Sequence, residues 1–152
     1  LPLPTDLTGE PATRYLISKT EQEKRRITLQ QVCLGSHTPQ WVNGHWLRFE
    51  NTIQASNEMT RTRTQLIQKA WDEGVAEGLA QKGSIFDEAL EKKWMEQWLF
   101  FANSTRMSSA MMGTDYGVFD KGRWYMAKNI QEISDWLKIL HSMGDETAKD
   151  TK

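Results

Sequence analysis

The longest periodic stretch of apolar residues runs through the middle of the chain. No proline interrupts the sequence from Phe49 to Ala80, and in its second half apolar side chains and glycines recur every three or four residues. That spacing matches the period of an α-helix and predicts one long amphipathic helix. Its first half is polar, which indicates a helix that extends past the core. The apolar face consists of Leu66, Ile67, Ala70, Trp71, Gly74, Val75, Gly78 and Leu79.

Two helix-start signals flank this stretch. Thr20 and Glu23 fit a capping box, in which each side chain bonds the other residue's backbone amide, ahead of a helix from about 21 to 33. Ser84 precedes a later helix with Asp87 in its first turn, where an acidic side chain suits the helix dipole. The end of that helix, at 98–101, is apolar nearly all round, so we expect it to be buried or at an interface.

The last predicted helix has the clearest core-facing stripe. Asn129 and Glu132 fit another capping box, and Gly144 stands where a glycine ends a helix. Trp136 lies at the centre of the stripe, so we expect its indole to be largely buried. The stripe consists of Ile130, Ile133, Trp136, Leu137 and Leu140.

Two short segments predict β-hairpins. Asn43-Gly44 lies between Trp41 and Trp46, and this dipeptide favours the positive φ angles of a tight hairpin turn. The alternative there is a turn that leads into a helix beginning near Trp46. The segment 118–126, with Gly122 in its turn, is the second hairpin candidate.

Together these elements predict a mainly α fold: a single helical domain of about four helices with one or two short β-hairpins. The domain is expected to span 13–144. Residues 1–12 contain three of the four prolines and predict a disordered N-terminal arm, while the polar residues 145–152 predict a disordered tail.

Composition limits the classes of function. The chain has 152 residues and a formal net charge of −1, whereas proteins that grip nucleic acid need a basic surplus, so no nucleic-acid partner is expected. No apolar run approaches the about 18 residues of a membrane-spanning helix. Because the chain opens without methionine, a removed signal peptide or anchor is left open. The single cysteine, Cys33, excludes an intramolecular disulfide and a cysteine-based zinc site.

No pattern in the sequence points to catalysis. His37, His45 and His141 lack the spacing of a metal-binding motif, and nucleophile, phosphate-loop and dinucleotide motifs are missing from the sequence. We therefore predict a non-enzymatic protein with no catalytic residue, no cofactor and no metal.

Aromatic, methionine and small residues predict contact surfaces instead. The seven tryptophans are a compositional outlier, and large aromatic side chains anchor both cores and interfaces. Gly74 and Gly78, four residues apart, predict a smooth groove on a helix face where another helix packs. The methionines between 103 and 117 suit an adaptable binding surface. The residues predicted to pack on another helix or a partner are Ala70, Trp71, Gly74, Gly78, Trp94, Trp98, Met107, Met111 and Met112.

The segment from about 71 to 90 resembles part of the DotC family, called TraI in some conjugative plasmids. The residues that carry the resemblance are Trp71, Gly74, Gly78, Gln81, Ile85, Phe86 and Leu90. The segment 19–24 is similar to a linker upstream of that stretch. Members of this family are envelope lipoproteins of type IVB secretion and conjugation machines. The resemblance implies a non-enzymatic envelope protein that acts by contact.

The function predicted from the sequence is therefore protein–protein interaction. The resemblance implies partners among conjugation or type IV secretion components of a bacterial envelope, in a periplasmic or membrane-associated location, or a related role as an exclusion protein of a plasmid. A dimer and a cytoplasmic location are left open. The alternative is a small ligand-binding or hydrolytic enzyme with a cleft lined by Trp and Met side chains.

Overall fold

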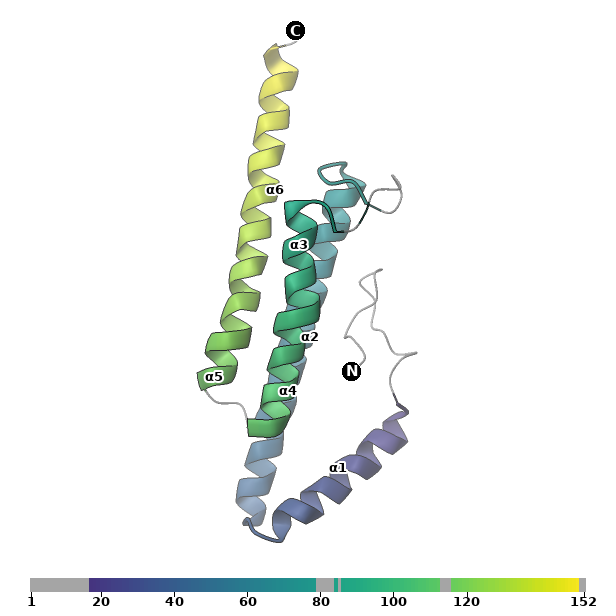
Figure 1. The fold of residues 1–152 in the computed structure, drawn as a ribbon, viewed down its shortest axis with the longest axis vertical. Coiled ribbons are helices and arrows are strands. Elements are labelled where there is room, and N and C mark those ends of the chain that lie inside the picture. The colour runs from purple at the N-terminus through teal and green to yellow at the C-terminus, as the bar shows by residue number, and fades with distance from the viewer. Residues whose placement is uncertain (1–16, 79–83, 85, 113–115, 151–152) are drawn as a thin grey trace.

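Three helical rods lie side by side along the long axis of the molecule (Figure 1). The computed structural model describes residues 17–78, 84, 86–112 and 116–150. The first rod is one helix, and the other two each contain a π-helical segment between α-helical ones. The rods are α2 (Pro39–Asp72); α3 (Ala89–Met95), η3 (Glu96–Phe101) and α4 (Ala102–Met112); and α5 (Tyr116–Val118), η4 (Phe119–Arg123) and α6 (Trp124–Asp150).

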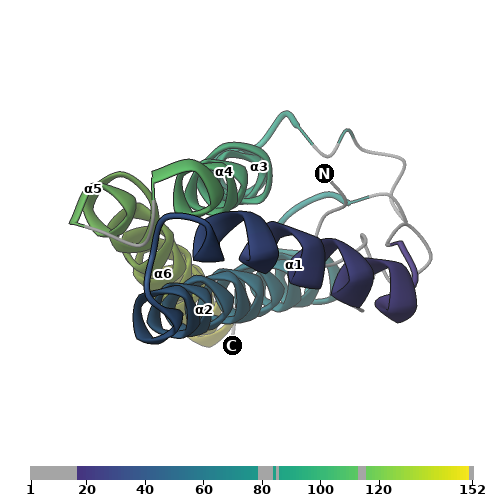
Figure 2. The ribbon, with the colours of Figure 1, turned by 90° about the horizontal axis from the view of Figure 1, so that it is seen from below.

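Helix α1 (Lys19–Leu34) runs away from the rods and packs against the first part of α2 (Figures 1 and 2). The hydroxyl of Ser18, not that of Thr20, caps it by accepting a hydrogen bond from the amide of Glu21 at 3.2 Å. The helix buries none of its side chains. A helix of this length is marginal in water without a packed face, so α1 contributes little to the core.

The first predicted hairpin is wrong, because its residues begin α2. Thr38 caps the helix by accepting a hydrogen bond from the amide of Trp41, and Pro39 occupies the first turn, where its fixed φ suits a helix. Helix formation buries Val42, which a lone two-stranded hairpin could not do. Gly44 lies inside the helix and does not adopt a positive φ.

Helix α2 ends at Asp72, earlier than the sequence pattern predicted. Gly74, with φ of 69°, is the left-handed residue that terminates it, and its amide donates to the carbonyl of Trp71. The amides of Val75 and Ala76 both donate to the carbonyl of Ala70. Gly74 and Gly78 therefore lie in the segment after the helix, and the predicted groove on a helix face does not form there.

The second rod begins at Glu88, not near Ser84. The amide of Glu88 donates to the carboxylate of Glu91 at 3.2 Å, and the hydroxyl of Ser84 accepts a hydrogen bond from Phe86. In η3 the amide of Ala102 donates to the carbonyl five residues earlier, which widens the helix by one residue. The apolar run at 98–101 falls in this widened turn.

The second predicted hairpin is also wrong. Its residues form the end of α5, η4 and the start of α6, and no strand occurs among the described residues. Gly122 is required there by close packing and not by a turn: a Cβ at this position would fall 2.0 Å from Oγ1 of Thr105 on α4. The glycine therefore lets η4 of the third rod lie close to α4 of the second rod.

The stripe predicted for α6 is displaced by one residue at its centre. The buried positions are Met126, Asn129, Ile133 and Leu137, and this spacing points Trp136 about 100° away from the core. The indole of Trp136 is 48% exposed, so its predicted burial is wrong. Asn129 lies inside α6 and does not cap it, and the helix continues through Gly144 to Asp150.

Two kinds of side chain fill the interior. An apolar cluster occupies the end of the bundle where α2 finishes and α3 begins, and it consists of Ile67, Ala70, Ala76, Leu90, Trp94, Ile133 and Leu137. Further along the rods the buried side chains are mostly polar. The buried polar side chains are Thr52, Ser56, Thr60, Arg63, Thr64, Glu91, Gln97, Thr105, Arg106, Ser109 and Asn129, of which Glu91 lies at the apolar end beside Trp71.

The structure confirms the mainly α class. None of the described helices has the length and apolar content needed to cross a membrane. The predicted arm at 1–12 lies outside the described residues, as do 151–152. Side chains of residues 111, 112, 116 and 144–150 are likewise outside the description.

Replacing Gly122 by alanine should destabilise the bundle by about 1–3 kcal/mol, because the new methyl group overlaps Thr105. Urea denaturation measures the change. Gly44→Ala is the matched control: its Cβ would meet only the flexible end of Arg48 at 3.4 Å, so alanine should be neutral or stabilising in that helix. Equal stability of both variants would show that the close approach does not constrain the fold.

Glu132→Gln should destabilise the protein at neutral pH by up to about 1 kcal/mol. Hydrogen bonding to Lys93 of α3 holds the pKa of the Glu132 carboxyl below its ordinary 4.5. The unfolded chain therefore binds the proton first, and this stabilisation is lost as pH falls through the lowered pKa. The difference between variant and parent should vanish in acid. A variant that stayed equally destabilised there would assign the effect to packing instead of charge.

Candidate functional site

The structure brings three of the predicted site tryptophans together in the apolar half of the interior. The rings of Trp71 and Trp94 meet edge to face with centroids 5.9 Å apart, and those of Trp94 and Trp98 lie tilted at 5.7 Å. Trp94 has no exposed surface, whereas Trp71 and Trp98 are partly exposed on either side of it. Ala70, also predicted, is buried in the same cluster. The three indoles thus form a continuous row across two rods.

The three indole N–H groups have different surroundings. Trp71 donates to Oε1 of Glu91 at 2.9 Å, and Trp94 donates to the hydroxyl of Thr64 at 3.1 Å. The buried indole nitrogen of Trp98 has no hydrogen-bond partner in the described part of the chain. Burial is the largest influence on the carboxyl group of Glu91 and raises its pKa, while the hydrogen bond from Trp71 acts to lower that pKa. No pattern in the sequence pointed to Glu91, which the fold brings to the site.

Gly78 belongs to this cluster, but Gly74 does not. A Cβ on Gly78 would fall 2.5 Å from Cγ of Trp71, so the backbone lies directly on the indole ring. A Cβ on Gly74 would meet nothing within 4 Å. The two glycines therefore serve different purposes, one making room for a ring and the other ending a helix.

The predicted methionine surface lies on α4, apart from the tryptophans. Met107 is exposed there, and Met111 and Met112 are in the same helix, with side chains outside the described residues. The prediction that these methionines contact a partner stays a prediction.

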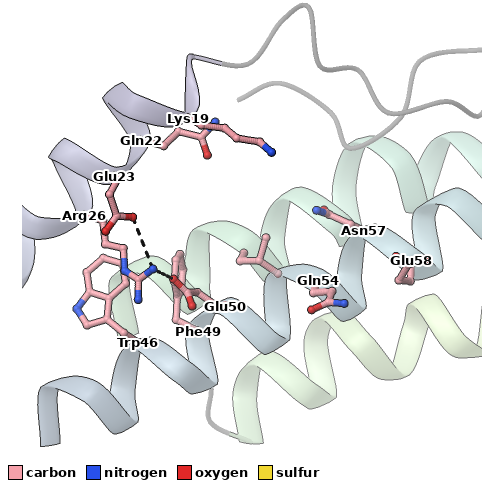
Figure 3. Close-up of a pocket in the computed structure, with 11 residues that line it drawn as sticks. Lys19, Gln22, Glu23, Arg26, Trp46, Phe49, Glu50, Gln54, Asn57 and Glu58 are labelled. Carbon is pink, nitrogen blue, oxygen red and sulfur yellow. Dashed lines mark ion pairs between the residues drawn. The ribbon is translucent and has the colours of Figure 1, made fainter.

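A cleft opens between α1 and α2 (Figure 3), with a volume of about 640 Å³. Arg26 of α1 closes one end of it by pairing with Glu50 of α2 at 3.0 Å, while Glu23 lies 3.7 Å from the same guanidinium nitrogen. Trp46 and Phe49 supply an aromatic floor. The cleft is open to solvent and most of its lining residues are polar or charged, so it lacks the enclosed apolar walls of a small-molecule pocket.

A row of aromatic rings follows the first turns of α2. His37 stacks on Trp41 with ring centroids 3.8 Å apart, and Trp41 stacks on His45 at 5.2 Å. Trp46 meets both His45 and Phe49 edge to face. The spacing of four residues places successive rings on one helix face. Trp41 is exposed, so this row forms part of the outer surface.

The polar half of the interior was missed by the sequence analysis. The guanidinium of Arg63 donates to the carbonyl of Asn129, but its Nε and Nη2 have no partner among the described residues. Arg106 donates to Asn57 at 2.7 Å and to Asn103 at 3.1 Å. Burial lowers the pKa of Arg63 to about 9 and that of Arg106 to about 10. No motif or periodicity in the sequence indicated that these two arginines are buried.

The described part of the chain holds no group of three His, Cys, Asp or Glu side chains placed to share a metal ion. His141 instead pairs with Glu73 at 2.8 Å, linking α6 to the end of α2. His37 and His45 are held in the aromatic row.

Among known proteins, the chain is similar to a solved structure described as a multiheme protein. No family model matches the chain, and no curated protein does. A solved structure described as "Hypothetical multiheme protein" matches 91% of this chain with a TM-score of 0.74 and 32% sequence identity. The chain spans only about a quarter, 26%, of that protein's length.

This match corrects the function predicted from the sequence. The matched protein is described as a multiheme protein, which contradicts a role as a conjugation or secretion component. The resemblance of the segment at about 71–90 to the DotC family stays a prediction.

Gly78→Ala should displace the indole of Trp71 and destabilise the protein by about 1–3 kcal/mol, because the added methyl group overlaps the ring. Urea denaturation and tryptophan fluorescence report the two effects. Gly74→Asn is the control from the same segment, since asparagine tolerates a positive φ and the site is open. A Gly78→Ala variant as stable as the control would contradict the packing described for Trp71.

Proposed function

We propose that this chain serves as the helical part of a multiheme electron-transfer protein. The observation that carries the proposal is the match of 32% identity over 91% of the chain to a protein described as multiheme. Identity at this level, extended along nearly the whole chain, supports a related role better than the fold alone would.

The residues of this chain do not fit a covalently attached heme of their own. The usual attachment motif is Cys-x-x-Cys-His, with a thioether bond from each cysteine. Here Cys33 is the single cysteine, and it is followed by Leu34, Gly35, Ser36 and His37. Heme also needs a largely apolar, enclosed pocket, whereas the cleft between α1 and α2 is open and lined by charged groups. The hemes therefore belong to polypeptide outside this chain.

Exposed apolar side chains on two helices support a position against such a heme-bearing portion. Helix α1 buries none of its side chains, and Ile27 and Val32 are among its exposed apolar residues. Helix α6 exposes Trp136 and Ile139, which lie three residues apart. Apolar helix faces of this kind are normally covered. The heme-bearing portion is the occupant that the match suggests for them.

The spectrum of the natural protein tests this proposal. Antibodies raised against the 152-residue chain would capture the protein that contains it from its native cells, whatever its full length. We expect the reduced-minus-oxidised absorption spectrum of the captured protein to contain heme bands. The recombinant 152-residue chain, produced in cells that mature c-type cytochromes, should carry none. A natural protein without heme would contradict the proposal.

A further inference from the structure

We propose that Trp71, Trp94 and Trp98 form a relay that carries single oxidising equivalents through the bundle interior and delivers them to Trp71. The proposal deepens the electron-transfer role and rests on it. Neighbouring rings have centroids 5.9 and 5.7 Å apart, which places their edges in van der Waals contact. Electronic coupling between aromatic rings falls steeply with distance, so adjacent indoles exchange an electron far faster than rings separated by a layer of aliphatic side chains.

The direction of the relay follows from the hydrogen bonds of the three indoles. Oxidation makes an indole N–H far more acidic than in the neutral ring, so a radical is stabilised where a base can take the proton. Trp71 donates to a carboxylate oxygen of Glu91, whereas Trp94 donates to a hydroxyl, which is a poor base. The indole nitrogen of Trp98 has no partner among the described residues. Of the three indoles, Trp71 alone has a carboxylate among the described residues to take its proton.

The carboxylate is held for this purpose by two donors. Oε1 of Glu91 accepts from Trp71, and Oε2 accepts from the amide of Glu88. The side chain is fully buried. Burying a carboxylate costs free energy of solvation, which an apolar side chain at this position would not cost. Burial raises the pKa of Glu91, so its carboxylate is a stronger base than one at the surface.

The step balances as a coupled loss of one electron and one proton. A one-electron oxidant of the transition-metal-complex class, positioned at the Trp98 side, takes an electron from Trp98 and is reduced by one unit. Trp94 then transfers an electron to the oxidised Trp98, and Trp71 transfers an electron to the oxidised Trp94. The indole proton of Trp71 then moves along the 2.9 Å hydrogen bond to Glu91. The products are a neutral indolyl radical and a protonated carboxyl, and one-electron reduction of the radical reverses both transfers.

Laser flash photolysis of a labelled chain tests the relay. A ruthenium photo-oxidant is attached at Ser104→Cys, an exposed position further along the second rod, in a chain that also carries Cys33→Ser. Replacing Trp41, Trp46, Trp124 and Trp136 by phenylalanine leaves only the three relay indoles. The flash should produce a neutral tryptophan radical by transient absorption. Trp71→Phe should abolish this neutral signal, which assigns it to Trp71.

Interrupting the row is the decisive variant. In Trp94→Phe the ring is kept but cannot be oxidised under the same conditions, so the neutral radical should be lost. Circular dichroism checks the fold, and Trp98→Phe, at a partly exposed position, gives the same test if the first variant is unfolded. A neutral Trp71 radical that forms at an unchanged rate in the folded variants would overturn the relay.

The role of the carboxylate has its own control. In Glu91→Gln the amide oxygen can accept the hydrogen bond but cannot take the proton, so the spectrum should change from a neutral to a cation radical. Glu96→Gln, at an exposed position of the same rod, should leave the neutral radical unchanged. Because the light-driven experiment needs no heme, its outcome is independent of the spectrum of the natural protein. A heme-free natural protein would overturn the proposed function, while a missing Trp71 radical would overturn only the relay.

Discussion

Burial of Trp94 is the contact on which the arrangement of the rods depends. Its indole has no exposed surface and lies against Trp71 at the end of α2. The indole N–H donates a hydrogen bond to the hydroxyl of Thr64 in the same helix α2. Ile133 and Leu137 of α6 complete the same cluster, so one side chain connects all three rods. A buried aromatic ring contributes more apolar surface than any aliphatic residue in this sequence can supply. The rest of the interior depends on this contact because much of it is polar.

The polar half of the interior determines how the rods fit together more than how stable they are. Arg63 and Arg106 place charged groups inside the bundle, where they lose solvation. This loss lowers the pKa of Arg63 to about 9 and that of Arg106 to about 10. Asn57 joins this layer to the outside, since it accepts from Arg106 and also lines the α1–α2 cleft (Figure 3). Buried polar groups with few partners stabilise little. Stability must therefore come mainly from the tryptophan end.

The sequence predicted the class of the fold because helical periodicity is a local property. It failed at Asn43-Gly44 and at Gly122, where the local turn preference of glycine was outweighed by packing of the surrounding helix. Trp136 was misplaced because two adjacent stripes on α6 are both apolar, and only the tertiary contacts decide which one is buried. In the candidate site, Trp71, Trp94 and Trp98 were predicted individually. Their association with Glu91 depends on a contact between Trp71 and Glu91, which are 20 positions apart along the chain. The periodicity of a single helix cannot predict such a contact.

The helical rods, the single cysteine and the match to a multiheme protein fit one arrangement, in which a heme-free bundle packs against a heme-bearing portion. The most direct measurement is an electron cryo-microscopy structure of the natural protein that contains this chain. The proposed arrangement predicts hemes bound entirely outside the rods, with α1 and the Trp136 face of α6 covered by the polypeptide that holds them. A heme attached to Cys33, or a natural protein without any heme, would contradict it.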